Sequence, residues 1–249
     1  MIRFDHRDTG LSTKMRGMRA KGSAYPRVLR YVVGRTSPVP YTLVDLAEDV
    51  KGLLDHLGIE RAHVVGASMG GMIAQTIAFR HPGRVLSLVS IMSNTGARFS
   101  GQPSLSMYGT LLKRAPRERE AYIEHQMQVF AKTGSPGFPR DEADKRELAV
   151  ASYERGHDPA GSGRQLAAII ASGDRTADLR TIRAPTLVIH GDKDRLVAPS
   201  GGRATAKAIP GARLLTIEGM GHDLPRGAWR RIIDAIAENA ARAVEPALA

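Results

Sequence analysis

Residues 66–71, with the sequence Gly-Ala-Ser-Met-Gly-Gly, constrain the fold of this chain more than any other segment. They follow the apolar run 62–65 and precede a helix-forming sequence. A strand, a Gly-x-Ser-x-Gly turn and a helix in that order are typical of a nucleophile elbow. Such a turn is so sharp that only residues without a Cβ fit beside it, and we expect Gly66 and Gly70 to supply that room. The pattern therefore indicates Ser68 as a candidate nucleophile.

The same turn places Ser68 immediately before the N-terminus of a helix. Free backbone N–H groups at that position can stabilise a developing oxyanion, so we expect the N–H of Met69 to be an oxyanion-hole donor. The motif alone is weak, because glycine and serine are common in loops, and an inert serine in a turn is the alternative. The strand before it and the helix after it favour the nucleophile.

A candidate acid follows the apolar run 185–189, which is typical of a buried parallel strand. Asp192 and Asp194 both lie in the polar turn after this run, where a carboxylate can orient a catalytic histidine. We favour Asp194, because it is further along the turn and can reach back over the edge of the sheet. Asp192 is expected to accept hydrogen bonds from local backbone N–H groups, as aspartates in turns often do.

His222 is the candidate base among the eight histidines of the chain. It lies in the segment 212–225, where a short predicted strand ends in a glycine-rich loop, and the glycines allow close approach of other groups. His63 and His190 lie in or beside predicted strands and are expected to be packed and hydrogen-bonded. The other five are expected at the surface or at helix ends: His6, His56, His81, His125 and His157.

The order Ser68, Asp194, His222 along the chain is that of α/β-hydrolases, and it differs from the orders of the chymotrypsin and subtilisin types. The chain resembles the α/β-hydrolase superfamily over nearly its whole length, and it is most similar to the aclacinomycin methylesterase and proline-iminopeptidase-like group of serine esterases. The specific motifs are those at residues 66–71, 190–194 and 219–222. The resemblance implies an α/β fold of the α/β-hydrolase kind, with a mostly parallel sheet, helices on both faces and a helical cap.

The predicted division is a core from residues 1–96 and 181–249 with a cap at 97–180. In the cap region the alternation of strands and helices stops, and helices are predicted over 118–131 and 142–153. Glycine- and proline-rich breaks are predicted at 134–139 and 159–163. Five side chains of this region are candidates to line a substrate pocket or simply to pack between helices: Met107, Tyr108, Met127, Phe130 and Phe138.

The first residues depart from the family pattern. Residues 2–5 are predicted as a strand and residues 7–12 look like the loop after the family's fourth strand, but no earlier strands and no His-Gly oxyanion loop precede them. The only His-Gly pair is His190-Gly191, in the later strand. Either the strand at residues 2–4 pairs directly with the Ser68 strand, or the chain is N-terminally incomplete, which we favour. The second oxyanion donor is not identified.

Composition excludes several classes of protein. The 249 residues suffice for one large core, and no run of about 18 apolar residues predicts a membrane helix. No signal peptide is recognised. The absence of cysteine excludes disulfides, a thiol nucleophile and cysteine metal sites, and it fits a cytoplasmic location.

The net charge of +11 raises the question of nucleic-acid binding. Basic residues are most dense between Arg3 and Arg35. Because aromatic residues are only 5% of the chain and no nucleic-acid-binding module is recognised, we interpret the charge as a solvated, arginine-rich surface.

These features predict a serine hydrolase that cleaves a carboxylic ester of a small molecule through an acyl-enzyme, with no metal or organic cofactor and no membrane or nucleic-acid partner. The oligomeric state stays open. One alternative is a catalytically impaired chain that acts as a binding module. Another is a peptidase for N-terminal proline, which needs acidic cap residues to bind the substrate amine; the candidates are Glu118, Glu120, Glu124, Asp141, Glu142 and Asp144. Dehalogenation by an aspartate is disfavoured, because Ser68 holds the nucleophile position.

Overall fold

A four-stranded parallel sheet lies at the centre of the computed structural model, which describes residues 1–18 and 38–243. The strands are β1 (Ala62–Ala67), β2 (Val85–Ile91), β3 (Thr186–Gly191) and β4 (Arg213–Ile217), adjacent in that order. Because all neighbours are parallel, the carboxyl ends of the four strands meet at one side of the sheet. The predicted parallel sheet is confirmed.

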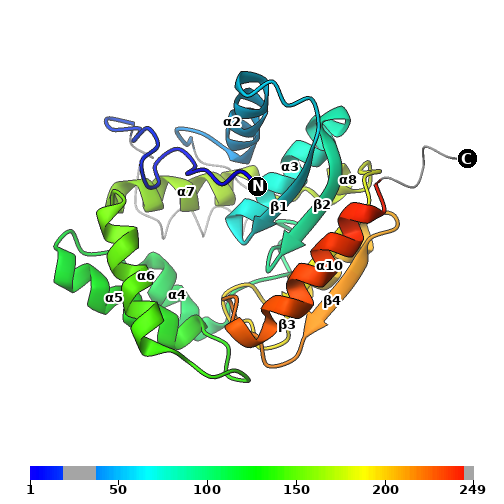
Figure 1. The fold of residues 1–249 in the computed structure, drawn as a ribbon. Helices are drawn as coiled ribbons and strands as arrows, with labels where there is room; N and C mark the ends of the chain where they lie inside the picture. The colour runs from blue at the N-terminus through cyan, green and yellow to red at the C-terminus, as the bar shows by residue number, and fades with distance from the viewer. Residues whose placement is uncertain (19–37, 244–249) are drawn as a thin grey trace, which may run out of the picture.

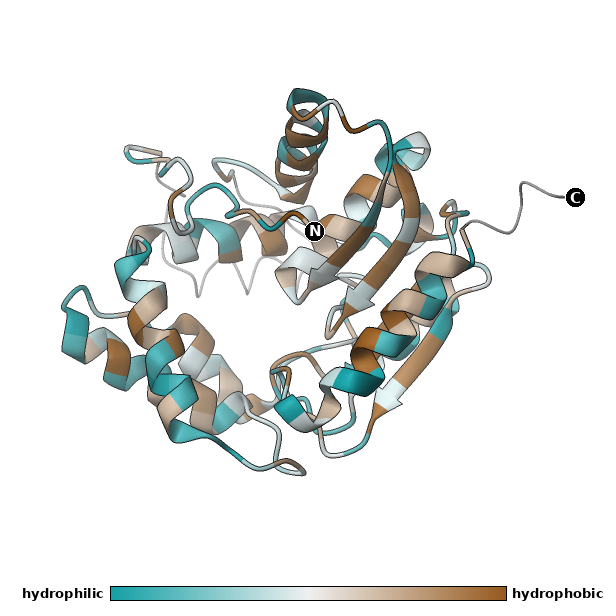
Figure 2. Ribbon diagram, in the orientation of Figure 1, coloured by the Kyte–Doolittle hydropathy of each residue, from teal (hydrophilic) through white to brown (hydrophobic). Residues whose placement is uncertain are grey.

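Helices cover both faces of this sheet (Figure 1). One face packs against α10 (Trp229–Ala241), whose Ile232 joins the side chains of β2 and β3 in a core cluster. The other face packs against α2 (Leu43–His56), α3 (Met69–Arg80) and α9 (Ser200–Ala208), which share a second cluster. Figure 2 shows the strands as mostly hydrophobic ribbons between these helices. Two apolar layers therefore fix the sheet from both sides, as expected for buried parallel strands.

Local sequence signals mark both ends of α2. Thr42 caps α2 in a reciprocal capping box, in which the backbone N–H of Thr42 donates to Asp45 at 2.8 Å. Gly58, with φ of +65°, follows the helix and stops it. Two short 3-10 helices, η1 (Pro82–Arg84) and η2 (Arg226–Ala228), complete the described core.

Five helices and no strand lie between β2 and β3, a region that is described throughout. They are α4 (Leu105–Leu112), α5 (Arg119–Thr133), α6 (Glu142–Glu154), α7 (Pro159–Ser172) and α8 (Thr176–Leu179). In Figure 1 the arrowheads of the strands point toward the side where α4, α5 and α6 lie. The division into a core and a cap at residues 97–180 stays a prediction.

The predicted break at residues 159–163 is wrong, because α7 begins at Pro159 and continues through it. Asp158 caps the helix by accepting the N–H of Ala160 at 3.0 Å. Proline is favourable at the first helical position, where its missing N–H costs nothing. Glycines at 161 and 163 are typical of a loop, but the cap and the burial of Gly161 favour the helix.

The candidate pocket residues of this region mostly pack. Met107 is buried, Met127 and Phe130 contact the small cluster around Ile123, and Phe138 packs against the core cluster under α10. These contacts favour the packing interpretation for these side chains.

The predicted strand at residues 2–5 is wrong, because residues 1–6 have no regular structure. Direct pairing of this segment with the Ser68 strand is therefore also wrong, and β2 is the only strand beside β1 in the described residues. Side chains of residues 5–15 instead anchor a series of turns, in which Arg7 binds Asp49 of α2. Of the basic segment between Arg3 and Arg35, residues 19–35 lie outside the described residues.

Candidate active site

Ser68 occupies a strained turn between β1 and α3. Its φ of +54° and ψ of −120° lie outside the regions that a serine ordinarily adopts. The turn is held at both ends: the N–H of Ser68 donates to Ile91 at 2.8 Å, and its carbonyl accepts the N–H groups of Gly71 and Met72 at 2.9 and 3.2 Å. Neighbouring hydrogen bonds thus fix the predicted elbow.

The room beside the turn comes from Gly66 and Gly71. A Cβ on Gly66 would lie 2.0 Å from the carbonyl oxygen of Gly70, so only glycine fits. The expectation that Gly70 also supplies room is wrong, because a Cβ there would meet no atom within 4 Å. Gly71 is needed instead, since its Cβ would lie 2.8 Å from Cβ of Ser93 at the end of β2.

The structure brings the three predicted residues into one hydrogen-bonded chain. Nε2 of His222 lies 2.9 Å from Oγ of Ser68, and Nδ1 of His222 lies 2.7 Å from Oδ2 of Asp194. The three come from different segments: the elbow, the turn after β3 and the loop after β4. Parallel strands place these segments at the same edge of the sheet.

The protons of this chain follow from its partners. An ionised carboxylate can only accept hydrogen bonds, so Nδ1 of His222 carries the hydrogen that faces Asp194. In the neutral ring Nε2 is then the acceptor, and the Ser68 hydroxyl donates to it. His222 is thus in the tautomer that can accept a proton from Ser68.

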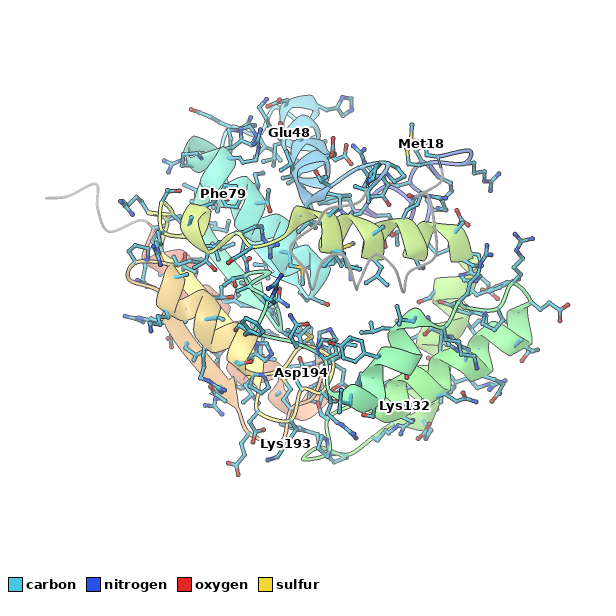
Figure 3. All side chains as sticks on the ribbon, turned by 180° about the vertical axis from the view of Figure 1, so that it is seen from behind. Met18, Glu48, Phe79, Lys132, Lys193 and Asp194 are labelled. Carbon is cyan, nitrogen blue, oxygen red and sulfur yellow. The ribbon has the colours of Figure 1, made fainter. Side chains whose placement is uncertain are left out.

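Asp194 remains ionised despite its burial. Its side chain is completely buried, and in Figure 3 it lies between the strands and the helices α4–α6. Burial alone would raise the pKa of Asp194, but hydrogen bonds from His190 and His222 outweigh it and lower the pKa to about 2. The N–H groups of Leu196 and Val197 also donate to Oδ1, at 2.9 Å each.

Asp192 accepts a backbone N–H, as the sequence predicts, but the donor lies 27 residues away and not in its own turn. Its Oδ1 accepts the N–H of Gly219 at 2.6 Å, which joins the turn after β3 to the start of the loop that carries His222. The choice of Asp194 over Asp192 as the partner of His222 therefore agrees with the geometry.

His190 is a neighbour that sequence analysis did not place at the site. It is 2% exposed, its Nε2 donates to the carbonyl of Val197 at 2.9 Å, and the same nitrogen lies 3.4 Å from Oδ2 of Asp194. The spacing of four residues between His190 and Asp194 is the signal that could have revealed it. His63, by contrast, is hydrogen-bonded to Ser87 as expected.

The N–H of Met69 belongs to the first turn of α3, where N–H groups have no acceptor within their own helix. The positive end of the helix dipole also lies there. Met69 stays the predicted oxyanion donor on these grounds. Within residues 1–18 and 38–243 no group of three acidic, histidine or cysteine side chains is arranged to hold a metal ion, and no helix could cross a membrane.

The chain is similar in sequence to known proteins over most of its length. A family model described as the alpha/beta hydrolase fold matches residues 2–225. Rhodomycin D methylesterase DnrP of Streptomyces peucetius is 28% identical over 246 residues, and the DauP enzyme of the same name from Streptomyces sp. (strain C5) is 30% identical. Each match covers 90% of this chain and 76% of the relative.

A solved structure of an N-acyl homoserine lactone degrading enzyme is also similar, with a TM-score of 0.61 and 26% identity. The match covers 93% of this chain and 80% of that one.

Proposed function

Because the chain belongs to the α/β-hydrolase fold family, we propose that it is a serine hydrolase that cleaves a carboxylic ester of a small molecule. The observation that carries the proposal is the continuous chain of hydrogen bonds from Ser68 through His222 to Asp194. A hydroxyl, an imidazole and a buried carboxylate in this order are the parts that acyl transfer through serine requires.

In the first step the Ser68 oxygen attacks the ester carbonyl while Nε2 of His222 takes the hydroxyl proton. Asp194 holds the imidazole in its tautomer and stabilises the imidazolium that forms. The tetrahedral oxyanion accepts a hydrogen bond from the N–H of Met69. The imidazolium then gives its proton to the leaving alcohol, and an acyl-enzyme on Ser68 results.

In the second step water attacks the acyl-enzyme, with His222 again as the base. The proton returns to the Ser68 oxygen when the tetrahedral intermediate collapses, and the carboxylic acid leaves. The same three side chains therefore serve both halves of the reaction, and the chemistry proposed for them needs no metal.

The relatives suggest the class of ester. DnrP and DauP are both named methylesterases. We therefore extend the proposal to the methyl ester of a small-molecule carboxylic acid, whose leaving group is methanol.

The test compares the chain with its Ser68→Ala variant on p-nitrophenyl butyrate and on a panel of aromatic methyl esters. We expect turnover by Ser68→Ala to fall by about 10⁴-fold or more, because nucleophile removal from a triad has effects of that size. Ser93→Ala is a matched control, since Ser93 is also buried, just after a neighbouring strand, and its hydroxyl has no hydrogen-bond partner among the described residues. Equal circular dichroism spectra establish that each variant folds.

Retention of activity by Ser68→Ala would show that the nucleophile is another group. Hydrolysis of p-nitrophenyl butyrate without hydrolysis of any methyl ester would support the proposed esterase activity and contradict its extension to methyl esters.

A further inference from the structure

The loop that carries His222, residues 219–223, is attached to the connection between α5 and α6 as well as to the sheet. We call residues 219–223 the histidine loop. The backbone N–H of His222 itself donates to the carbonyl of Thr133, the last residue of α5, at 2.7 Å. The N–H of Gly137 donates to the carbonyl of Gly219 at 2.9 Å. Both ends of the loop are therefore bonded to a segment that is distant in sequence.

The two backbones approach so closely that side chains are excluded. A Cβ on Gly221 would lie 2.4 Å from the carbonyl oxygen of Gly134, and a Cβ on Gly219 would lie 2.6 Å from Cα of Gly137. Gly219 also has φ of +73°, which other residues rarely adopt. The glycines beside His222 thus serve this contact, which is more specific than general loop flexibility.

A polar cluster closes the same contact on the other side of His222. Asp223 accepts a hydrogen bond from the hydroxyl of Ser135. It also forms an ion pair with Lys145 of α6, whose Nζ lies 2.9 Å from Oδ2 of Asp223. The Ser135 oxygen in turn accepts the N–H of Gly221 at 2.9 Å. Residues on both sides of His222 are therefore fixed by Ser135 and Lys145.

The ion pair differs from the surface pairs of the same helix. Side-chain exposure is 21% for Lys145 and 16% for Asp223, and Nζ of Lys145 also lies 5.5 Å from the ring centre of Phe130. Arg146, the next residue of α6, pairs with Glu120 and Glu124, and all three side chains are about half or more exposed. Exposed pairs contribute little, whereas a shielded pair holds its partners in one geometry.

We propose that Lys145, Ser135 and Asp223 are positioning residues that set the place of His222 against Ser68. The inference rests on the proposed function, in which His222 is the base. Because the bond from Nε2 to Ser68 spans 2.9 Å, a small shift of the histidine loop lengthens it, and proton transfer depends steeply on that distance. Because His222 serves both acylation and deacylation, both steps slow together, so the effect falls on kcat and leaves KM unchanged.

The experiment measures kcat and KM for p-nitrophenyl butyrate in Lys145→Met, Lys145→Arg, Asp223→Asn and Arg146→Met. We expect Lys145→Met to lower kcat about ten-fold at unchanged KM, as misplaced catalytic groups do. Lys145→Arg keeps the charge and is expected to restore most of the loss. Arg146→Met is the matched control, because the ion pairs that it removes join the same helix to Glu120 and Glu124 of α5.

Asp223→Asn removes the ion pair with little change of shape, so it provides a second measurement if Lys145→Met folds poorly. We expect it to lower both kcat and the rate at which a fluorophosphonate labels Ser68, because the labelling reaction also needs His222. The double variant of Lys145→Met with Asp223→Asn is expected to lower kcat no further than the more damaging single variant, since both substitutions remove the same ion pair.

Unchanged kcat in folded Lys145→Met and Asp223→Asn would overturn the inference, and so would a rise in KM alone. An equal loss in Arg146→Met would also overturn it, because the effect would then be a general one of α6. The inclusion of Ser68→Ala separates the two proposals: if that variant keeps its turnover, the proposed function itself fails, whatever Lys145→Met does.

Discussion

Two aspartates of this molecule, Asp8 and Asp194, are equally buried but have different side-chain partners. Each residue is 4% exposed. Each carboxylate accepts at least one backbone N–H and is held ionised by nearby donors, so that its pKa lies below the ordinary value. Asp8 faces the guanidinium of Arg164, whereas Asp194 faces the imidazole of His222.

The partner decides what each carboxylate can do. A guanidinium keeps its protons at any ordinary pH, so the pair of Asp8 and Arg164 can only hold parts of the chain together. It joins the first turns of the chain to α7, and Tyr41, just before α2, donates to the same carboxylate at 2.6 Å. An imidazole exchanges its proton near neutral pH, so the same negative charge at Asp194 can support proton transfer.

The largest expected effect tests the functional side of this comparison. Asp194→Asn removes the charge with little change of shape, and the amide can stabilise the wrong tautomer of His222. We expect kcat for an ester to fall by about 10⁴-fold, as observed when the equivalent group of a serine triad is changed. Steady-state kinetics and thermal unfolding of the same preparation check it. A loss of turnover that only follows a loss of folded protein would make Asp194 a structural residue like Asp8.

The next effect tests the structural side. Asp8→Asn leaves Arg164 buried with half of its pairing, since Asp158 still lies 2.9 Å from it. Breaking a buried ion pair costs roughly 3–5 kcal/mol of unfolding free energy. Because Arg164 keeps Asp158 as a partner, we expect a loss near the lower limit, about 3 kcal/mol. Urea unfolding measures this loss, and kcat per folded molecule is expected to stay close to that of the parent chain. A large fall in kcat without loss of stability would show that Asp8 acts on the site.

The sequence predicted the carboxylate that faces His222 and missed the one that faces Arg164, for a physical reason. Asp194 lies at a fixed place in a short local pattern, an apolar strand followed by a polar turn, and local patterns are visible in one sequence. The partner of Asp8 is 156 residues away, on a helix that sequence analysis interrupted at its first turn. Contacts between residues so far apart in the sequence depend on the three-dimensional path of the chain, and no short sequence pattern predicts them.

The same distinction explains the detail around the elbow. Gly66 was predicted correctly because the turn itself demands it, whereas Gly71 is required by Ser93 at the end of a different strand. The strand predicted at residues 2–5 also failed for this reason: its residue types suit a strand, but no neighbouring strand pairs with it in the described residues. Local chemistry was predictable, and the pairing of distant segments was not.

The smallest effect tests what the two aspartates share. Because folding lowers the pKa of both, the unfolded chain binds their protons at higher pH than the folded chain does. The stability that they contribute is therefore fully present above about pH 4 and is lost as the pH falls through the folded pKa, which is about 2 for Asp194. For Asp194 the loss is roughly 2 kcal/mol.

Urea unfolding at a series of pH values between 6 and 2 measures this loss, with the parent chain beside Asp8→Asn and Asp194→Asn. Each variant lacks one of the two titrating groups, so its unfolding free energy is expected to fall less steeply than that of the parent chain as the solution becomes acidic. A slope in either variant equal to that of the parent would show that the removed carboxyl has the same pKa in the folded and unfolded states. The hydrogen bonds to that carboxyl would then do no more than offset the effect of its burial.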